Sequence, residues 1–207
     1  MARVPDRSLA LEKYRRGIAS YDESNRYRRL RANSVAHLDL RPGDHVLDVA
    51  CGTGLNFSLI QEAIGQHGRL IGVDLSPDML AIARERASKA NSDQVTLIHS
   101  AVEKAQLPDR VDAALFCLTH DVMRSPAALE NVMRSVKKGG RVVAAGSKWA
   151  PWRAWYVNIG VWYGARRYTT TFDGFSCPWS HLSPYLSGIE IELHLRGAMY
   201  VARGNKA

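Results

Sequence analysis

Residues 46–54 read Val-Leu-Asp-Val-Ala-Cys-Gly-Thr-Gly, and the triplet Gly72-Val73-Asp74 follows after one helix-length segment. An apolar run leads into small residues, and a second apolar run ends on a carboxylate, which is the order of a nucleotide-binding β-α-β unit. Glycine lets the backbone approach a ligand closely because it has no Cβ. The Asp74 carboxylate is placed to accept hydrogen bonds from both hydroxyls of a ribose.

The glycine spacing narrows the class of ligand. A dinucleotide fingerprint, G-x-G-x-x-G, needs a third glycine where this chain has Phe57. No Lys-Ser or Lys-Thr pair follows Gly54, so the loop is not a phosphate-binding P-loop either. We therefore expect a nucleoside ligand that carries no phosphate.

Strand and helix patterns alternate through most of the chain, with Ser76-Pro77 as a capped helix start. Such alternation predicts an α/β fold with a doubly wound, mostly parallel sheet that binds its ligand at the carboxyl ends of the strands. The predicted helices, one or two of them in the first range, cover residues 8–36, 56–64, 77–90 and 126–136. The predicted strands cover residues 46–49, 70–73, 95–99, 113–118, 141–145, 189–195 and 198–202.

The composition is that of an ordinary globular protein, with 46% apolar and 23% charged residues among 207. This length predicts one domain, residues 1–207. No apolar run approaches the ~20 residues of a membrane span, and the N-terminus does not have the pattern of a secretory signal. Three widely spaced cysteines indicate neither a disulfide framework nor a metal site, so we expect a cytoplasmic protein without metal.

The net charge of +8 lies largely within residues 1–31. A basic N-terminal segment favours either contact with an anionic surface, such as phospholipid headgroups or nucleic acid, or simply a solvated helix face. Both interpretations stay open. Nucleic acid as the substrate is disfavoured, because no RNA-binding module is recognisable in the chain.

Several motifs in order resemble those of one enzyme family. Residues 48–54 and 72–80, then 107–113 and 129–140, resemble the motifs of class I S-adenosylmethionine-dependent methyltransferases, and the likeness covers residues 14–145. The resemblance implies a Rossmann-like methyltransferase fold with one antiparallel C-terminal strand, and S-adenosyl-L-methionine as cofactor. It also implies that residues 1–40 form an N-terminal helical cap.

The resemblance assigns the cofactor contacts residue by residue. Asp74 is expected on the ribose, Leu75 and Met79 beside the adenine, and the first loop near the amino-acid moiety. The implied cofactor residues are Tyr14, Asp48, Ala50, Cys51, Gly52, Gly54, Asn56, Asp74, Leu75, Met79, Ser100, Ala101, Val102 and Cys117. The chain departs from the family where many relatives carry Gly-Asp, since it has Ser100-Ala101. Ser100, Glu103 or backbone must then contact the adenine amino group.

Methyl transfer from a sulfonium needs the donor and the nucleophile held in line and water excluded, and the sequence shows no catalytic triad. His120 follows the predicted strand 113–118, where the family places residues facing the methyl group. It is a candidate general base, or alternatively it caps the following turn. Asp121, next to His120, and Tyr21 are the other catalytic candidates. Tyr21 is included because relatives with a pair like Tyr21-Asp22 close the N-terminal helix over the cofactor.

All five tryptophans fall within residues 149–179. Trp152, Trp155 and Trp162 step at helical spacing, so one helix is predicted with an aromatic face. We expect residues 147–180 to form an insertion that covers the substrate, or alternatively an apolar helix face that packs on the sheet. The candidate substrate residues are Trp149, Trp152, Trp155, Tyr156, Arg167 and Tyr168.

The preferred function is methyl transfer to a small hydrophobic or aromatic acceptor. One alternative is a phospholipid N-methyltransferase at the membrane surface, with peripheral contact to anionic lipid. A second is attack at another sulfonium carbon, which transfers or cyclises the aminocarboxypropyl arm and releases methylthioadenosine. A third is a cofactor-binding regulator without turnover. The sequence makes no prediction of the methylated atom or the oligomeric state.

Overall fold

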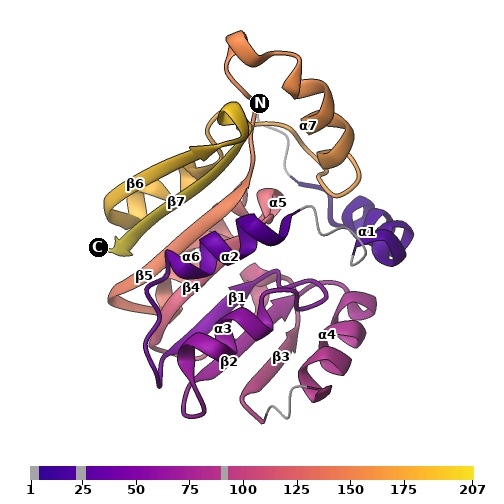
Figure 1. Cartoon of the computed structure of the whole chain (residues 1–207). Helices are drawn as coiled ribbons and strands as arrows, with labels where there is room; N and C mark the ends of the chain where they lie inside the picture. The colour runs from indigo at the N-terminus through magenta and orange to yellow at the C-terminus, as the bar shows by residue number, and fades with distance from the viewer. Residues whose placement is uncertain (1–4, 22–26, 90–92) are drawn as a thin grey trace.

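The computed structural model describes residues 5–21, 27–89 and 93–207, and it is built around one seven-stranded sheet. The strand order is β3-β2-β1-β4-β5-β7-β6 (Figure 1). The strands are β1 His45–Val49, β2 Arg69–Asp74, β3 Val95–His99, β4 Val111–Cys117, β5 Val136–Ser147, β6 Leu186–His194 and β7 Met199–Lys206. β1 to β5 pair in parallel, and β7 is antiparallel to both its neighbours. The predicted fold class, including the single antiparallel C-terminal strand, is confirmed.

The α-helices are α1 Arg7–Tyr21, α2 Arg28–Ala36, α3 Phe57–Ile64, α4 Pro77–Lys89, α5 His120–Met123, α6 Pro126–Ser135 and α7 Val157–Ala165. Ser76 and Ser125 begin α4 and α6 as the sequence indicates. The Ser76 Oγ accepts from the Met79 N–H at 3.3 Å, and the Ser125 Oγ accepts from the Ala128 N–H at 3.3 Å. The helical pattern of residues 8–36 resolves into two helices, α1 and α2.

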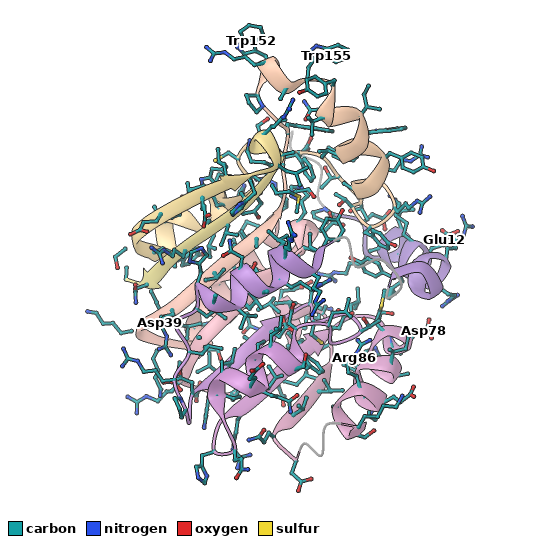
Figure 2. The ribbon with its side chains drawn as sticks, viewed as in Figure 1. Glu12, Asp39, Asp78, Arg86, Trp152 and Trp155 are labelled. Carbon is teal, nitrogen blue, oxygen red and sulfur yellow. The ribbon has the colours of Figure 1, made fainter. Side chains whose placement is uncertain are left out.

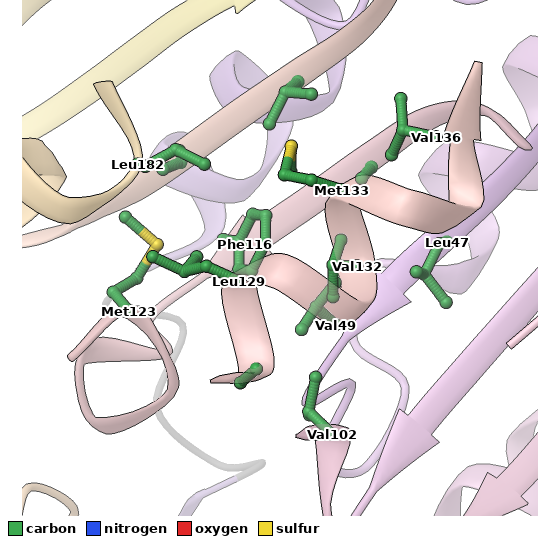
Figure 3. Packing of buried hydrophobic residues seen from close by; sticks show 14 of the residues in the cluster. Leu47, Val49, Val102, Phe116, Met123, Leu129, Val132, Met133, Val136 and Leu182 are labelled. Atoms are coloured by element: carbon green, nitrogen blue, oxygen red, sulfur yellow. The ribbon is translucent and has the colours of Figure 1, made fainter. Parts of the chain in front are cut away.

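Apolar side chains pack on both faces of the sheet. In β1, Leu47 and Val49 belong to the cluster that includes Leu129 and Val132 of α6, shown in Figure 3. Val46, which precedes Leu47 and points to the other face, packs with the cluster beneath α2, α3 and α4. Strand side chains alternate between faces, so a strand buried on both sides reads as a continuous apolar run.

Several predicted elements differ in extent from the structure: β6 begins at Leu186 and β7 continues to Lys206, beyond the predicted bounds. The strand predicted over residues 141–145 begins earlier, at Val136, because Val136 pairs with Val111 before the register shifts. The single helix predicted through Trp152 and Trp162 is a short 3₁₀ turn, Trp152–Ala154, followed by α7. The Asn158 side chain accepts from the Ala150 N–H at 2.7 Å and donates to the Ala150 carbonyl at 3.2 Å, which ties the turn to α7.

None of the helices in the described part of the chain combines the length and the apolar composition needed to cross a bilayer.

Candidate active site

The carboxyl ends of β1, β2 and β4 surround a cleft of about 120 Å³, which we call the strand-end cleft. Parallel strands bring their carboxyl ends to one edge, which explains why loops far apart in sequence meet here. Nine of the fourteen residues expected at the cofactor come from several segments of the chain and line this cleft together: Tyr14, Ala50, Gly52, Asp74, Leu75, Met79, Ala101, Val102 and Cys117. A tenth, Asp48, is buried and does not line it. Asp121 and Tyr168 line it as well.

Asp74 holds the two loops of the cleft together. Its Oδ2 accepts a hydrogen bond from the Gly52 N–H at 2.8 Å, and its Oδ1 accepts from the Ser76 N–H at 2.8 Å. Burial raises the pKa of Asp74, against the opposing effect of the backbone hydrogen bonds from Ser76, Gly52 and Leu75. This carboxylate is therefore both a structural anchor of the loops and an acceptor at the edge of the cleft.

Asp48 is a buried carboxylate behind the same loop. Each of its oxygens accepts from the Asn56 Nδ2 at 3.1 Å, and the Asn56 Oδ1 accepts from Arg31 at 3.1 Å. Burial raises the pKa of Asp48 to about 7, while the Asn56 hydrogen bond and the positive charge of Arg31 oppose that rise. Asn56, which the family resemblance places at the cofactor, thus positions Asp48 from behind and does not line the cleft.

Arg31 is a site residue that the sequence interpretation missed. It was expected to belong to a basic N-terminal surface, but it is 7% exposed and it contacts Asn56. Arginine is rarely buried unless it is paired. No local pattern separates Arg31 from its exposed neighbours on α2, because it donates hydrogen bonds to Asn56 at the end of the β1–α3 loop and to Cys117 of β4.

The remaining predicted cofactor residues lie behind the cleft. Cys51 is buried, and burial raises the pKa of its thiol. Ser100 donates its hydroxyl hydrogen bond to the Ala101 carbonyl at 3.0 Å. Gly54 has φ +77°, and a Cβ built there would lie 2.6 Å from the ring of the fully buried Phe57. Gly54 is therefore needed for the turn and for packing in the protein itself.

We expect Gly54→Ala to lower the free energy of unfolding by about 2 kcal/mol, from backbone strain at positive φ plus the contact with Phe57. Urea unfolding measures the change. Gly43→Ala is the matched control, because Gly43 also has positive φ (+91°) but has open space at its Cβ position. This control should lose about 1 kcal/mol from backbone strain alone, and equal losses in the two variants would contradict the packing role of Gly54.

A smaller hollow of about 50 Å³ adjoins the strand-end cleft, and we call it the inner chamber. The two share Leu118, Thr119 and Tyr168 in their linings. Aromatic residues form much of the chamber wall. The described residues that line it include Tyr27, His120, Ser147, Gly164, Ala165, Phe175 and Tyr200.

His120 lies in the chamber wall, with a hydrogen bond at one ring nitrogen and none at the other. Its Nε2 lies 3.2 Å from the Asp173 carbonyl, and its ring meets Phe175 edge-on at 4.8 Å. Burial lowers the pKa of His120 to about 4, so the ring is neutral near neutral pH. A neutral ring that donates from Nε2 to a carbonyl leaves a lone pair on Nδ1. Within the described residues, His120 Nδ1 and the Thr119 Oγ1 are buried without a hydrogen-bond partner.

Asp121 ties the aromatic segment to the cleft. Its Oδ2 accepts from the Thr170 N–H at 2.9 Å and from the Thr170 Oγ1 at 2.8 Å, and burial raises its pKa against these hydrogen bonds. The α1 residue Lys13 donates to the carbonyls of Arg166 and Thr169 at 2.9 and 2.7 Å. Tyr21 is the last residue of α1, and its side chain and Asp22 lie outside the described residues.

Most of the candidate substrate residues do not line the strand-end cleft or the inner chamber. Trp149 stacks on Phe172 at 5.2 Å, so it packs within its own segment. Trp152 and Trp155 are 79% and 65% exposed and point away from the body of the protein (Figure 2). Arg167 is exposed and donates to the Tyr163 hydroxyl at 3.2 Å. Of the six candidate substrate residues, Tyr168 alone lines the cleft and the chamber. That residues 147–180 cover the substrate stays a prediction.

Tyr156 lines a third and larger hollow of about 880 Å³ between α2, α7 and the start of β7, which we call the α7 groove. The groove shares Tyr27 and Ser147 with the inner chamber. The three hollows therefore form a series from the cofactor loops to the side of α7. No group of three His, Cys, Asp or Glu side chains suited to a metal ion occurs in the part of the chain that the structure describes.

Comparison with known proteins gives a family match over part of the chain. Residues 46–140 match the family described as "Methyltransferase domain". The demethylmenaquinone methyltransferase of Oceanobacillus iheyensis is 32% identical over 133 residues, which are 60% of this chain and 56% of that protein. The demethylmenaquinone methyltransferase of Symbiobacterium thermophilum is 36% identical over 113 residues, 53% of this chain and 45% of that protein. The chain spans about half the length of these curated relatives.

Solved structures share the fold. The N-methyltransferase NodS from Bradyrhizobium japonicum WM9, in complex with S-adenosyl-L-homocysteine, matches with a TM-score of 0.69 at 14% identity, covering 96% of this chain and 98% of its own. A SAM-dependent methyltransferase from Aquifex aeolicus matches with a TM-score of 0.63 at 18% identity, covering 91% and 98%. The chain therefore has the fold of these solved methyltransferases, and its residues 46–140, which include the first loop, match the methyltransferase-domain family.

Proposed function

We propose that this protein binds S-adenosylmethionine in the strand-end cleft and transfers its methyl group to a small apolar or aromatic acceptor in the inner chamber. The observation that carries the proposal is the pair of unpartnered buried atoms, His120 Nδ1 and Thr119 Oγ1, within the described residues where the two hollows adjoin. Buried polar atoms are normally hydrogen-bonded, so two buried atoms without a partner beside a cleft favour a ligand that forms the missing hydrogen bonds.

The side chains of the cleft fit the cofactor. Asp74 supplies carboxylate oxygens for the ribose hydroxyls, and Asp48 supplies negative charge beneath the first loop, near the expected ammonium group. Leu75, Met79 and Val102 supply apolar surface for the adenine. When bound, the cofactor supplies a methyl group already activated on a sulfonium.

The chamber residues then have positioning and proton-accepting roles. His120 is neutral, so its Nδ1 can accept a proton from an acceptor hydroxyl, and the Asp173 carbonyl fixes the ring through Nε2. Thr119 orients the acceptor through its hydroxyl. Tyr168 and Phe175 exclude water, and holding the two reactants together supplies roughly 7–11 kcal/mol of the barrier reduction.

The aromatic wall favours a ring-shaped acceptor. Phe175 is buried, and Phe175 and His120 offer ring faces and edges to a planar molecule. The relatives of Oceanobacillus iheyensis and Symbiobacterium thermophilum are named for a quinone acceptor, demethylmenaquinone, which supports an acceptor of this class for our protein. The cytoplasmic location expected from the sequence stays a prediction.

Mass spectrometry of the products formed from S-adenosylmethionine tests the proposal directly. The purified protein is incubated alone, with a cell metabolite extract, and with a cell lipid extract. S-adenosylhomocysteine that forms only with extract, together with an acceptor heavier by one methylene unit, is the expected result. Methylthioadenosine in its place would overturn methyl transfer and favour attack at another sulfonium carbon.

We expect His120→Gln to lower kcat by about a hundredfold with little change in cofactor affinity, because a positioned general base contributes about that factor. The pKa of His120, about 4, also predicts that the base stays neutral from about pH 5.5 to pH 8. The kcat/KM should therefore show no loss near pH 6.5, where an ordinary histidine is half protonated. His67→Gln, at an exposed histidine before β2, is the matched control. An unchanged kcat in His120→Gln would assign the histidine to loop positioning.

A further inference from the structure

Helix α7 presents an unusually apolar face to solvent. None of its nine residues is buried. The side chains of Trp152, Trp155, Tyr156, Ile159, Trp162 and Tyr163, which we call the α7 surface, are all exposed. Trp152 and Trp155 project furthest from the sheet in Figure 2, and Ile159 is 64% exposed between the tryptophans. Exposed apolar patches of this kind mark interaction sites.

Arginines stand over the rings of the α7 surface. The Arg166 guanidinium lies 4.4 Å from the Trp162 ring and 4.7 Å from the Tyr163 ring, and Arg153 lies 5.7 Å from the Trp152 ring. Residues 148–172 contain four cations and no Asp or Glu. The surface therefore combines exposed rings, an exposed aliphatic side chain and positive charge, which complements a surface that is apolar inside and anionic outside.

The opposite face of α7 lies toward the site. Val157 and Val161, one helical turn apart, pack against Ala150, Ala154 and Ala198. The same two valines line the α7 groove, which leads by its shared residues to the inner chamber. Tyr156 belongs to the α7 surface and also lines the groove, so the surface and the groove adjoin at this helix. α7 lies beyond the carboxyl end of β5 (Figure 1).

We propose that the α7 surface docks on an anionic lipid bilayer. Tryptophan and tyrosine prefer the headgroup level of a bilayer, and arginine beside them pairs with lipid phosphates. A second copy of this chain is disfavoured, because a two-fold interface would bring the same arginines face to face. Single-stranded nucleic acid is disfavoured too, because it binds in basic grooves, whereas Ile159 offers no ring for a base to stack on.

The docking does not rest on the proposed function, but it would give the methyl acceptor a path from the membrane to the site. A bilayer contact at α7 places the α7 groove beside the lipid, so an acceptor dissolved in the membrane reaches the chamber without crossing bulk water. A water-soluble acceptor would need no such arrangement.

Co-sedimentation with vesicles tests the docking. We expect the protein to pellet with vesicles of phosphatidylcholine and phosphatidylglycerol in equal parts at low salt, and to pellet about tenfold less with phosphatidylcholine alone or at high salt. Tryptophan emission should shift to the blue on binding. Trp155→Ser with Ile159→Ser should weaken partitioning about tenfold, and so should Arg153→Gln with Arg166→Gln.

Two double variants on other surfaces are the controls. Ile191→Ser with Leu193→Ser removes exposed apolar side chains from β6, and Arg69→Gln with Lys138→Gln removes exposed charges near the starts of β2 and β5. Both should partition like the unsubstituted protein. Failure to pellet with anionic vesicles, equal partitioning of all variants, or binding of a single-stranded oligonucleotide without vesicle binding would each overturn the proposal.

Calorimetry with S-adenosylhomocysteine keeps the two proposals separate. The α7 variants should bind it as the unsubstituted protein does, and unchanged melting would show that they fold. Vesicle binding without nucleoside binding would leave the docking in place and overturn the proposed function. Nucleoside binding without vesicle binding would overturn only the docking.

Discussion

Asp48→Asn is expected to stabilise the ligand-free protein at about pH 8 and to weaken its binding of S-adenosylmethionine. Burial raises the pKa of Asp48 to about 7, well above the ~3.9 of an unfolded chain. Between about pH 4 and pH 7 the folded protein therefore holds a proton that the unfolded chain has released. The free energy of unfolding consequently falls as the pH rises through this window, by up to about 4 kcal/mol.

Asparagine removes this pH-dependent cost because it has no charge to bury. We expect the free energy of unfolding to rise by about 2 kcal/mol at pH 8. This is less than the full pH-dependent cost of about 4 kcal/mol, because Arg31 then lacks its negative neighbour. At about pH 4 the two proteins should have nearly equal stability. Urea unfolding at both pH values measures the difference, and calorimetry measures the loss of cofactor affinity.

Asp112→Asn is the control of opposite sign. Burial opposes ionisation of Asp112, but hydrogen bonds from the His45 N–H and Lys137 hold its pKa below the ordinary value. Its carboxylate therefore stabilises the fold above about pH 4, and this variant should lose stability at pH 8. A loss of stability in Asp48→Asn at pH 8 would show that the Asn56 and Arg31 contacts outweigh the cost of burial.

Asp74→Ala is expected to weaken cofactor binding about a hundredfold. Two charge-assisted hydrogen bonds to ribose hydroxyls, at about 1.5 kcal/mol each, account for this factor. The substitution also leaves the Gly52 and Ser76 N–H groups without their acceptor, so the free energy of unfolding should fall by about 2 kcal/mol while the fold persists.

Calorimetry with S-adenosylhomocysteine measures the affinity, and a melting curve follows the fold. Asp78→Ala is the matched control, because Asp78 lies in the first turn of α4, close to Asp74 in sequence, but is exposed and pairs with Arg15 at 3.5 Å. Its affinity should stay within about twofold. An Asp74→Ala variant that binds as tightly as the control would show that the carboxylate serves only to join the two loops.

Local patterns explain why much of the fold was predictable. The capping contacts of Ser76 and Ser125 reach three residues along the chain, so the sequence alone indicates where α4 and α6 begin. Residues 46–49 are all buried, and Val46, Leu47 and Val49 give the mostly apolar run of a parallel strand. The alternation of such segments then determines a doubly wound sheet and its binding edge.

The site depends on contacts between residues far apart in sequence, which no local pattern predicts. Arg31 reaches Asn56 across the β1–α3 loop, and His120 is held by the Asp173 carbonyl fifty-three residues away. Whether a polar atom has a partner depends on everything packed around it, so the unpartnered nitrogen of His120 is visible only in the folded chain.

In the aromatic segment around α7, the sequence again predicts the local pattern, and the tertiary structure decides which side chains are buried. Helical spacing of Trp155, Ile159 and Trp162 predicts which residues share a face, because that depends only on the period of the helix. Which face meets the protein depends on where the helix lies, and here Val157 and Val161 face inward while the tryptophans face solvent. The sequence by itself determined the sheet, the cofactor loops and the residues on each face of α7. Only the tertiary structure decided which carboxylates are buried and which rings are exposed, because burial is set by contacts between distant segments.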